Sequence, residues 1–121
     1  MLDFVDEYVK SMQFEPVQDG YELRLPFELF NAETPITLHL QKKDGYISID
    51  DRGYTMQYLD FNDVDLNDYK DDVEIICEMF RLKIEDGLVK SNIGYIETLT
   101  FKELHSYLQG LGLLATIHFL D

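Results

Sequence analysis

The segment of residues 63–74 places oxygen-bearing side chains at intervals that could hold a divalent cation. Counted as a twelve-residue calcium loop, it has such side chains at positions one, three, five, nine and twelve. That loop needs glycine at position six, where this chain has Asp68, and Lys70 stands at position eight, which is usually apolar. We therefore interpret the segment as the solvated acidic start of a helix, and we expect no metal ion and no cofactor.

Carboxylates beside a lysine on a hairpin can hold Mg²⁺ in a nuclease, and two turns of this chain offer them. One turn has Asp50 and Asp51, and the other has Glu85, Asp86 and Lys90. An enzyme that acts on DNA also needs a basic surface, which this chain lacks. We interpret both segments as polar turns, and a divergent metal-dependent nuclease remains the less favoured alternative.

Other catalytic patterns are missing from the sequence. Cys77, the single cysteine, lies in an apolar run, where a buried small side chain is expected and a reactive thiolate is not. His39, His105 and His118 form no metal-ligand spacing. No Gly-x-Ser-x-Gly elbow, P-loop or dinucleotide-binding glycine motif occurs. The sequence therefore favours a protein without catalytic residues, and we predict that it is not an enzyme.

The most motif-like string is Asp-Asp-Arg-Gly-Tyr-Thr at residues 50–55. A turn explains it, because Gly53 can adopt a positive φ and an aspartate can accept hydrogen bonds from the turning backbone. The string also resembles the Thr-Asp-Asp-Gly-Tyr-Thr signature of a bacterial and phage family, domain of unknown function 1828. The resemblance covers about residues 20–93, including the hairpin at 36–49 and the later helix leading into residues 80–88.

Two departures from that family concern charged positions. Arg52 stands where the family tends to have a second aspartate, and Leu29-Phe30 replace an expected Asp-Arg after Pro26-Phe27. If those positions carry an activity in the family, this chain has lost it. The resemblance implies a phage or mobile-element setting, and it brings no catalytic residues.

Charge is the strongest global signal of the sequence. The chain of 121 residues has 24 Asp and Glu against ten Lys and Arg, which gives a net charge of −14. Nucleic acids and anionic membranes repel such a chain, so we expect neither as a direct partner. A basic protein surface is the favoured partner, including a groove that normally holds DNA. Seven acids gathered within fifteen residues are the predicted partner-binding residues: Asp60, Asp63, Asp65, Asp68, Asp71, Asp72 and Glu74.

Periodicity predicts the elements that carry these residues. Helical spacing indicates three helices: one over about 2–13, one from Asn67 or Asp68 through Phe80, and one that begins at Thr100. Gly110 and Gly112 are expected to end the last helix early. Alternation indicates strands at 21–25, 36–41, 46–49 and around the Asp86-Gly87 turn, while 54–59 could form a helical turn. We therefore predict a single α+β domain over residues 1–121, with an antiparallel β-sheet packed on one face by helices.

Three functions are open at this point. The favoured one is a non-enzymatic acidic protein-binding module, in its sharpest form a phage DNA mimic that inhibits a basic host protein. The second is an oligomerising accessory protein, because the segment with Leu108, Leu111 and Leu113 through Leu120 is more apolar than one helix face requires. The third is the divergent nuclease. The acidic first residues do not fit a signal peptide and no long apolar stretch occurs, so we expect a cytoplasmic location.

Overall fold

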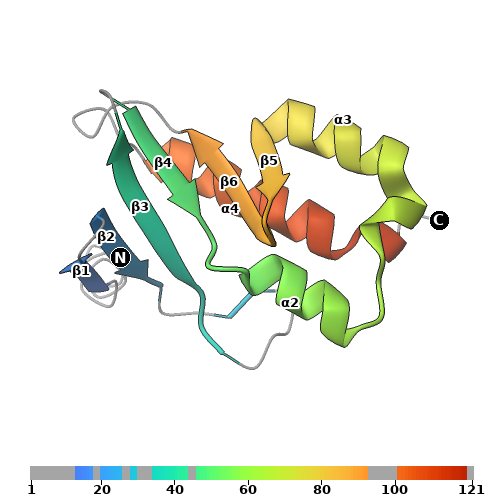
Figure 1. Cartoon of the computed structure of the whole chain (residues 1–121), viewed down its shortest axis with the longest axis horizontal. Helices are drawn as coiled ribbons and strands as arrows, with labels where there is room; N and C mark the ends of the chain where they lie inside the picture. The colour runs from blue at the N-terminus through green and yellow to red at the C-terminus, as the bar shows by residue number, and fades with distance from the viewer. Residues whose placement is uncertain are drawn as a thin grey trace, which may run out of the picture.

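The computed structural model describes residues 13–17, 20–25, 28–29, 34–43, 46–92 and 101–119. Its elements, in chain order, are β1 (Gln13–Val17), β2 (Gly20–Arg24), β3 (Thr37–Lys43), β4 (Tyr46–Asp50), α2 (Tyr54–Phe61), the 3-10 turn η1 (Leu66–Tyr69), α3 (Lys70–Phe80), β5 (Leu82–Glu85), β6 (Leu88–Asn92), α4 (Phe101–Ala115) and the 3-10 turn η3 (Ile117–Phe119). Along the longest axis, β1 and β2 lie at one end, and the connection from α2 to α3 lies at the other (Figure 1).

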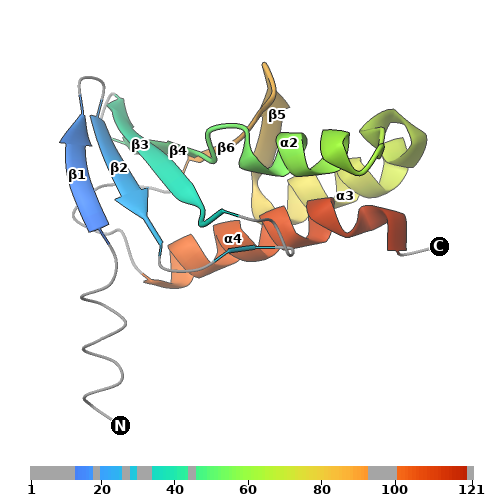
Figure 2. The same ribbon diagram turned by 90° about the horizontal axis from the view of Figure 1, so that it is seen from below.

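The six described strands form one antiparallel sheet in the order β1-β2-β3-β4-β6-β5. Helices α2, α3 and α4 pack against it, and α4 runs beneath the strands in the view of Figure 2. The predicted fold class, an α+β arrangement of an antiparallel sheet with packed helices, is confirmed. None of the helices that the structure describes is both long enough and apolar enough to cross a bilayer.

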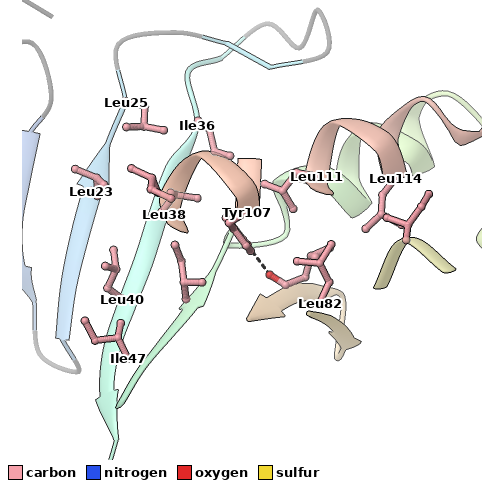
Figure 3. Packing of buried hydrophobic residues seen from close by; sticks show 14 of the residues in the cluster. Leu23, Leu25, Ile36, Leu38, Leu40, Ile47, Leu82, Tyr107, Leu111 and Leu114 are labelled. Atoms are coloured by element: carbon pink, nitrogen blue, oxygen red, sulfur yellow. Dashed lines mark hydrogen bonds between the residues drawn. The ribbon is translucent and has the colours of Figure 1, made fainter. Parts of the chain in front are cut away.

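The core forms where alternate strand residues meet α4. Leu38 and Leu40 of β3 and Ile47 and Ile49 of β4 are buried, and Leu40 pairs with Ile49 across the ladder. All four belong to one cluster with Leu111 of α4, and Figure 3 shows Leu38, Leu40 and Ile47 on the strands beside that helix. Because side chains of a strand alternate between two faces, the intervening polar residues lie on the opposite face of the sheet.

Strand β1 was not among the predicted strands, and it contains a proline, Pro16. The strand pairs with β2 over its whole length, and Pro16 lies opposite Tyr21. Because β1 is at the edge of the sheet, it has only one partner strand, and a residue without an N–H is tolerated there.

The prediction for α3 was right in its buried stripe and wrong in its cap. Ile76 is buried, and Val73, Cys77 and Phe80 are packed against the core. Neither Asn67 nor Asp68 caps the helix. Instead the chain enters α3 through η1, whose first backbone donors are met by Asp65.

The C-terminal apolar residues are divided between core and surface. Leu111, Leu114 and Ile117 are fully buried, while Leu113 is 36% exposed and Phe119 is 70% exposed. Part of this segment therefore serves the core of its own chain. Three expectations lie outside the described residues: the helix over about residues 2–13, of which only Gln13 is described and lies in β1, the capping residue Thr100 and the position of Leu120.

The prediction that glycines end α4 early was wrong, because the helix continues to Ala115. A Cβ at Gly110 would lie 2.8 Å from Leu82 Cδ1 and 3.0 Å from Phe80 Cβ. A Cβ at Gly112 would have no neighbour within 4 Å. Gly110 therefore allows α4 to approach the junction of α3 and β5 closely, which a larger residue would prevent.

These two glycines give a matched pair of substitutions. We expect Gly110→Ala to destabilise the protein by about 1–2 kcal/mol through overpacking against Phe80 and Leu82. We expect Gly112→Ala to stabilise it by about 0.5–1 kcal/mol, because alanine restricts the unfolded chain and favours the helix. Urea denaturation of both variants measures the difference, and a Gly110→Ala protein as stable as Gly112→Ala would contradict the close approach.

Candidate functional site

The seven predicted partner-binding acids lie between the last turn of α2 and the second turn of α3, a stretch here named the acidic segment (residues 60–74). All seven side chains are exposed. Asp60 lies in the last turn of α2, Asp63 and Asp65 lie between α2 and η1, and Asp71 lies in the first turn of α3. Figure 1 shows this connection at the opposite end of the molecule from β1. The structure therefore gathers the acids on one end of the fold.

The end of α2 fixes the direction in which the acidic segment leaves the helix. Asp63 adopts a left-handed conformation with φ of 57°. The Val64 N–H donates to the Leu59 carbonyl at 2.9 Å, and the Asp63 N–H donates to the Asp60 carbonyl at 3.1 Å. This is the Schellman hydrogen-bond pattern, in which the chain reverses tightly after the helix. Leu59, only 1% exposed, anchors the turn in the core.

The start of α3 is arranged by two electrostatic effects. Asp65 accepts a hydrogen bond from the Asn67 N–H at 2.9 Å and so caps η1. Asp71 and Asp72 lie in the first turn of α3, where the positive end of the helix dipole stabilises negative charge. The local structure therefore tolerates several carboxylates close together, although their mutual repulsion opposes it.

A groove of about 690 Å³ lies along the acidic segment. It is formed by α2, the connection after it, the start of α3 and one residue of β5. The lining combines carboxylates with apolar side chains: Met56, Asp60, Asp63, Val64, Asp65, Leu66, Asn67, Lys70, Val73 and Ile84. The structure thus brings three of the seven predicted acids together around one groove. Asp68, Asp71, Asp72 and Glu74 are not among the residues that line it.

Sequence analysis missed the apolar floor of this groove. Met56 comes from α2, Val64 from the connection and Ile84 from β5, so sequence spacing gave no sign that they meet. The one available signal was the run of Val64 and Leu66 among acids, which marks residues that pack inward between exposed carboxylates.

Positive charge is distributed unevenly over the described residues. Their ion pairs lie on the strands and on the turn after β4: Arg24 with Glu15 and Glu22, Arg52 with Glu22, His39 with Asp50, and Lys83 and Lys90 with Glu85. In the described part of the chain, no lysine, arginine or histidine lies within 4.0 Å of a carboxylate of the acidic segment. The glutamates of the sheet are thus held in ion pairs, whereas the carboxylates of the acidic segment, which also contains Lys70, are not.

The string at residues 50–55 is accounted for by its own hydrogen bonds. Asp51 is fully buried, and its carboxylate accepts the N–H of Gly53 at 3.1 Å, of Thr55 at 3.0 Å and of Val89 at 3.3 Å. Gly53 has φ of 82°, as a turn into α2 requires. The Tyr54 hydroxyl donates to the Thr34 carbonyl at 2.7 Å. These contacts give the string a structural role in joining β4, α2 and β6.

The carboxylates proposed for a nuclease do not converge. Asp51 faces the interior, whereas Asp50 accepts from the Arg52 N–H at 2.8 Å and lies 3.3 Å from His39 Nδ1 on the other face of the sheet. Glu85 is held by Lys83 at 2.9 Å and Lys90 at 3.3 Å. Among the residues described, no three His, Cys, Asp or Glu side chains are grouped so as to hold a metal ion.

Burial affects proton binding at two groups, the half-buried Cys77 and the buried Tyr107. Burial raises the pKa of the Cys77 thiol, which lowers its thiolate fraction at neutral pH. Burial also raises the pKa of Tyr107 well above its ordinary value, and the negative charges of Asp51 and Asp50 add to this effect. The Tyr107 hydroxyl donates to the Val89 carbonyl at 2.6 Å, the contact marked by the dashed line in Figure 3.

Comparison with protein-family models, curated proteins and solved structures finds no match for this chain. The resemblance to the domain of unknown function 1828 family therefore stays a prediction based on residues 50–55 and their neighbours.

Replacement of Asp51 tests its structural role. We expect Asp51→Ala to lower the free energy of unfolding by about 3 kcal/mol or more, because it leaves three buried N–H groups without an acceptor. Asp51→Asn keeps one carboxamide oxygen and should cost about half as much. Chemical denaturation measures both, with Glu78→Ala at an exposed position of α3 as the control. An Asp51→Ala protein no less stable than Glu78→Ala would show that the buried hydrogen bonds contribute little.

The raised pKa of Tyr107 predicts a loss of stability in alkali. The folded state holds the proton more tightly than the unfolded state, so this contribution is complete below about pH 10 and is lost as pH rises through the folded pKa. Tyr107→Phe should be about 1 kcal/mol less stable at neutral pH, because the bond to Val89 is lost. Above about pH 10 its stability should fall less steeply than that of the parent. Denaturation curves across this range, with Tyr46→Phe as an exposed control, decide the point; equal slopes for parent and Tyr107→Phe would contradict it.

Proposed function

We propose that this protein is a non-enzymatic module that binds a basic protein surface through the acidic segment. The observation that carries the proposal is the separation of charge. The ion pairs of the described residues all lie on the sheet and its turns, where five cations contact glutamates or Asp50. In the same part of the chain, no cation lies within 4.0 Å of any of the seven exposed carboxylates at the other end of the molecule.

Such an arrangement favours association with cationic proteins in two ways. The summed field of the carboxylates reaches beyond direct contact and increases the rate of encounter with a positively charged partner. The same field repels nucleic-acid backbones and anionic lipid surfaces, which are bound through lysine and arginine clusters. The charge thus selects the class of partner before any detailed fit is made.

The sharper form of the proposal is DNA mimicry. Carboxylates held on one end of a fold can stand in for phosphates in the groove of a nuclease or regulator, and the protein would then inhibit that enzyme. The acidic composition supports this form, and so does the resemblance of residues 50–55 to a phage and mobile-element family. The separation of Asp50 and Asp51 onto different faces speaks against a shared metal site at that turn.

Affinity capture from a bacterial lysate tests the proposal. We compare the parent protein with the variant Asp68→Asn, Asp71→Asn, Asp72→Asn and with a control of equal charge change, Glu28→Gln, Glu78→Gln, Asp86→Asn. The control acids are also exposed but lie outside the acidic segment. We expect a basic, nucleic-acid-handling protein to bind the parent and the control at about 0.1 M salt, and to be lost at about 1 M salt, where charges are screened within a few ångströms.

The acidic-segment variant should bind that protein about tenfold more weakly. Each exposed charge contributes a few tenths of a kcal/mol to binding, and three charges are removed. Retention that is unchanged by salt, or equal loss in variant and control, would show that the acidic segment is not the binding surface.

A further inference from the structure

The groove beside the acidic segment differs from the rest of that surface in having an apolar floor. Met56, Val64 and Ile84 line it together with Asp60, Asp63 and Asp65. Met56, Val64 and Ile84 are each only partly buried by their own chain. An apolar surface that stays partly exposed gains free energy when a ligand covers it, and carboxylates around it select the charge of that ligand.

We propose that this groove receives one apolar side chain of a lysine- or arginine-rich protein segment, whose cationic residues then contact the surrounding carboxylates. This inference rests on the proposed function and names the kind of segment that the acidic surface recognises. The groove is open to solvent, and its volume of about 690 Å³ leaves room for a leucine or phenylalanine side chain to lie against its apolar residues.

The surroundings of the groove favour a polypeptide over a small cationic molecule. Asp68, Asp71 and Asp72 continue the negative surface into the first turn of α3, outside the groove itself. A small amine would be held inside the groove and would leave those carboxylates without a partner. A chain segment can place one residue in the groove and further cations along α3, so it uses both parts of the surface.

Lys70 is expected to oppose this binding, so its replacement should strengthen the affinity that replacement of the aspartates weakens. It is the one cation among the described residues that line the groove, together with Asp60, Asp63 and Asp65. Its own charge repels a cationic segment, so its removal should strengthen binding. We expect Lys70→Gln to bind a cationic peptide about threefold more tightly than the parent, as for the loss of one exposed charge.

Two synthetic peptides of lysine and arginine test the inference, one with a single central leucine and one with serine in its place. Binding to the full chain is measured by isothermal titration calorimetry at low and high salt. We expect the leucine peptide to bind the parent about tenfold more tightly than the serine peptide, because one leucine side chain becomes buried. Methyl NMR shifts of Val64 and Ile84 should follow the leucine peptide only.

A variant with an altered floor separates apolar contact from charge. Met56→Gln with Val64→Thr keeps the size and charge of the groove while making its floor polar, so the advantage of the leucine peptide should disappear. The variant Asp60→Asn, Asp63→Asn, Asp65→Asn should weaken both peptides. Asparagine suits the left-handed turn at residue 63 and the cap at residue 65, so the fold should be kept.

The outcomes distinguish this inference from the proposed function. Equal binding of the two peptides, still sensitive to salt, would overturn the role of the groove and leave the acidic surface as the binding site. Absence of binding by both peptides at low salt would overturn the groove and would count against the acidic surface as well.

Discussion

The buried carboxylate of Asp51 is the interaction on which the arrangement of this fold depends. It accepts N–H groups from Gly53 and Thr55, at the start of α2, and from Val89 in β6. Val89 in turn offers its carbonyl to the Tyr107 hydroxyl of α4. The N–H of Val89 therefore binds the Asp51 carboxylate just before α2, and its C=O binds Tyr107 of α4. Because a buried charge without these partners would be strongly unfavourable, the three elements are held in one relative position.

The position of the acidic segment follows from this constraint. Asp51 sets where α2 begins, and the Schellman turn at Asp63 sets how the chain leaves it. The carboxylates that follow are therefore carried on a fixed support and not on a free tail. A rigid set of charges loses little conformational entropy when it meets a partner, which favours recognition by a defined surface.

The distribution of charge has a thermodynamic consequence. Unpaired carboxylates that lie close together repel each other and lower the stability of the folded state. The dipole of α3 and the cap at Asp65 offset part of this repulsion. Arg24, Arg52, Lys83 and Lys90 pair with glutamates of the sheet and its turns, while among the described residues no cation lies within 4.0 Å of a carboxylate of the acidic segment. On the proposed function, a cationic partner would offset the repulsion that remains.

Local sequence patterns determined much of this protein. Alternation in β3 and β4, the Asp86-Gly87 turn and the stripe of α3 were predictable, because each depends on neighbours a few residues apart. The exposure of the seven acids also followed from their type, since carboxylates are rarely buried without partners. Asp51 is the exception, because it is buried by hydrogen bonds to a turn and to a residue 38 positions away.

Tertiary structure decided the rest. Pro16 is tolerated in a strand because β1 is at the edge of the sheet. Glycine is needed at position 110 of α4 because Phe80 and Leu82 occupy the space that a Cβ would take. The groove exists because α2, the acidic segment and β5 meet, although Met56 and Ile84 are far apart in the chain. Residue types and short-range spacing fix which side chains are charged or apolar. Which of them meet is set by packing between distant elements, and no local pattern encodes that.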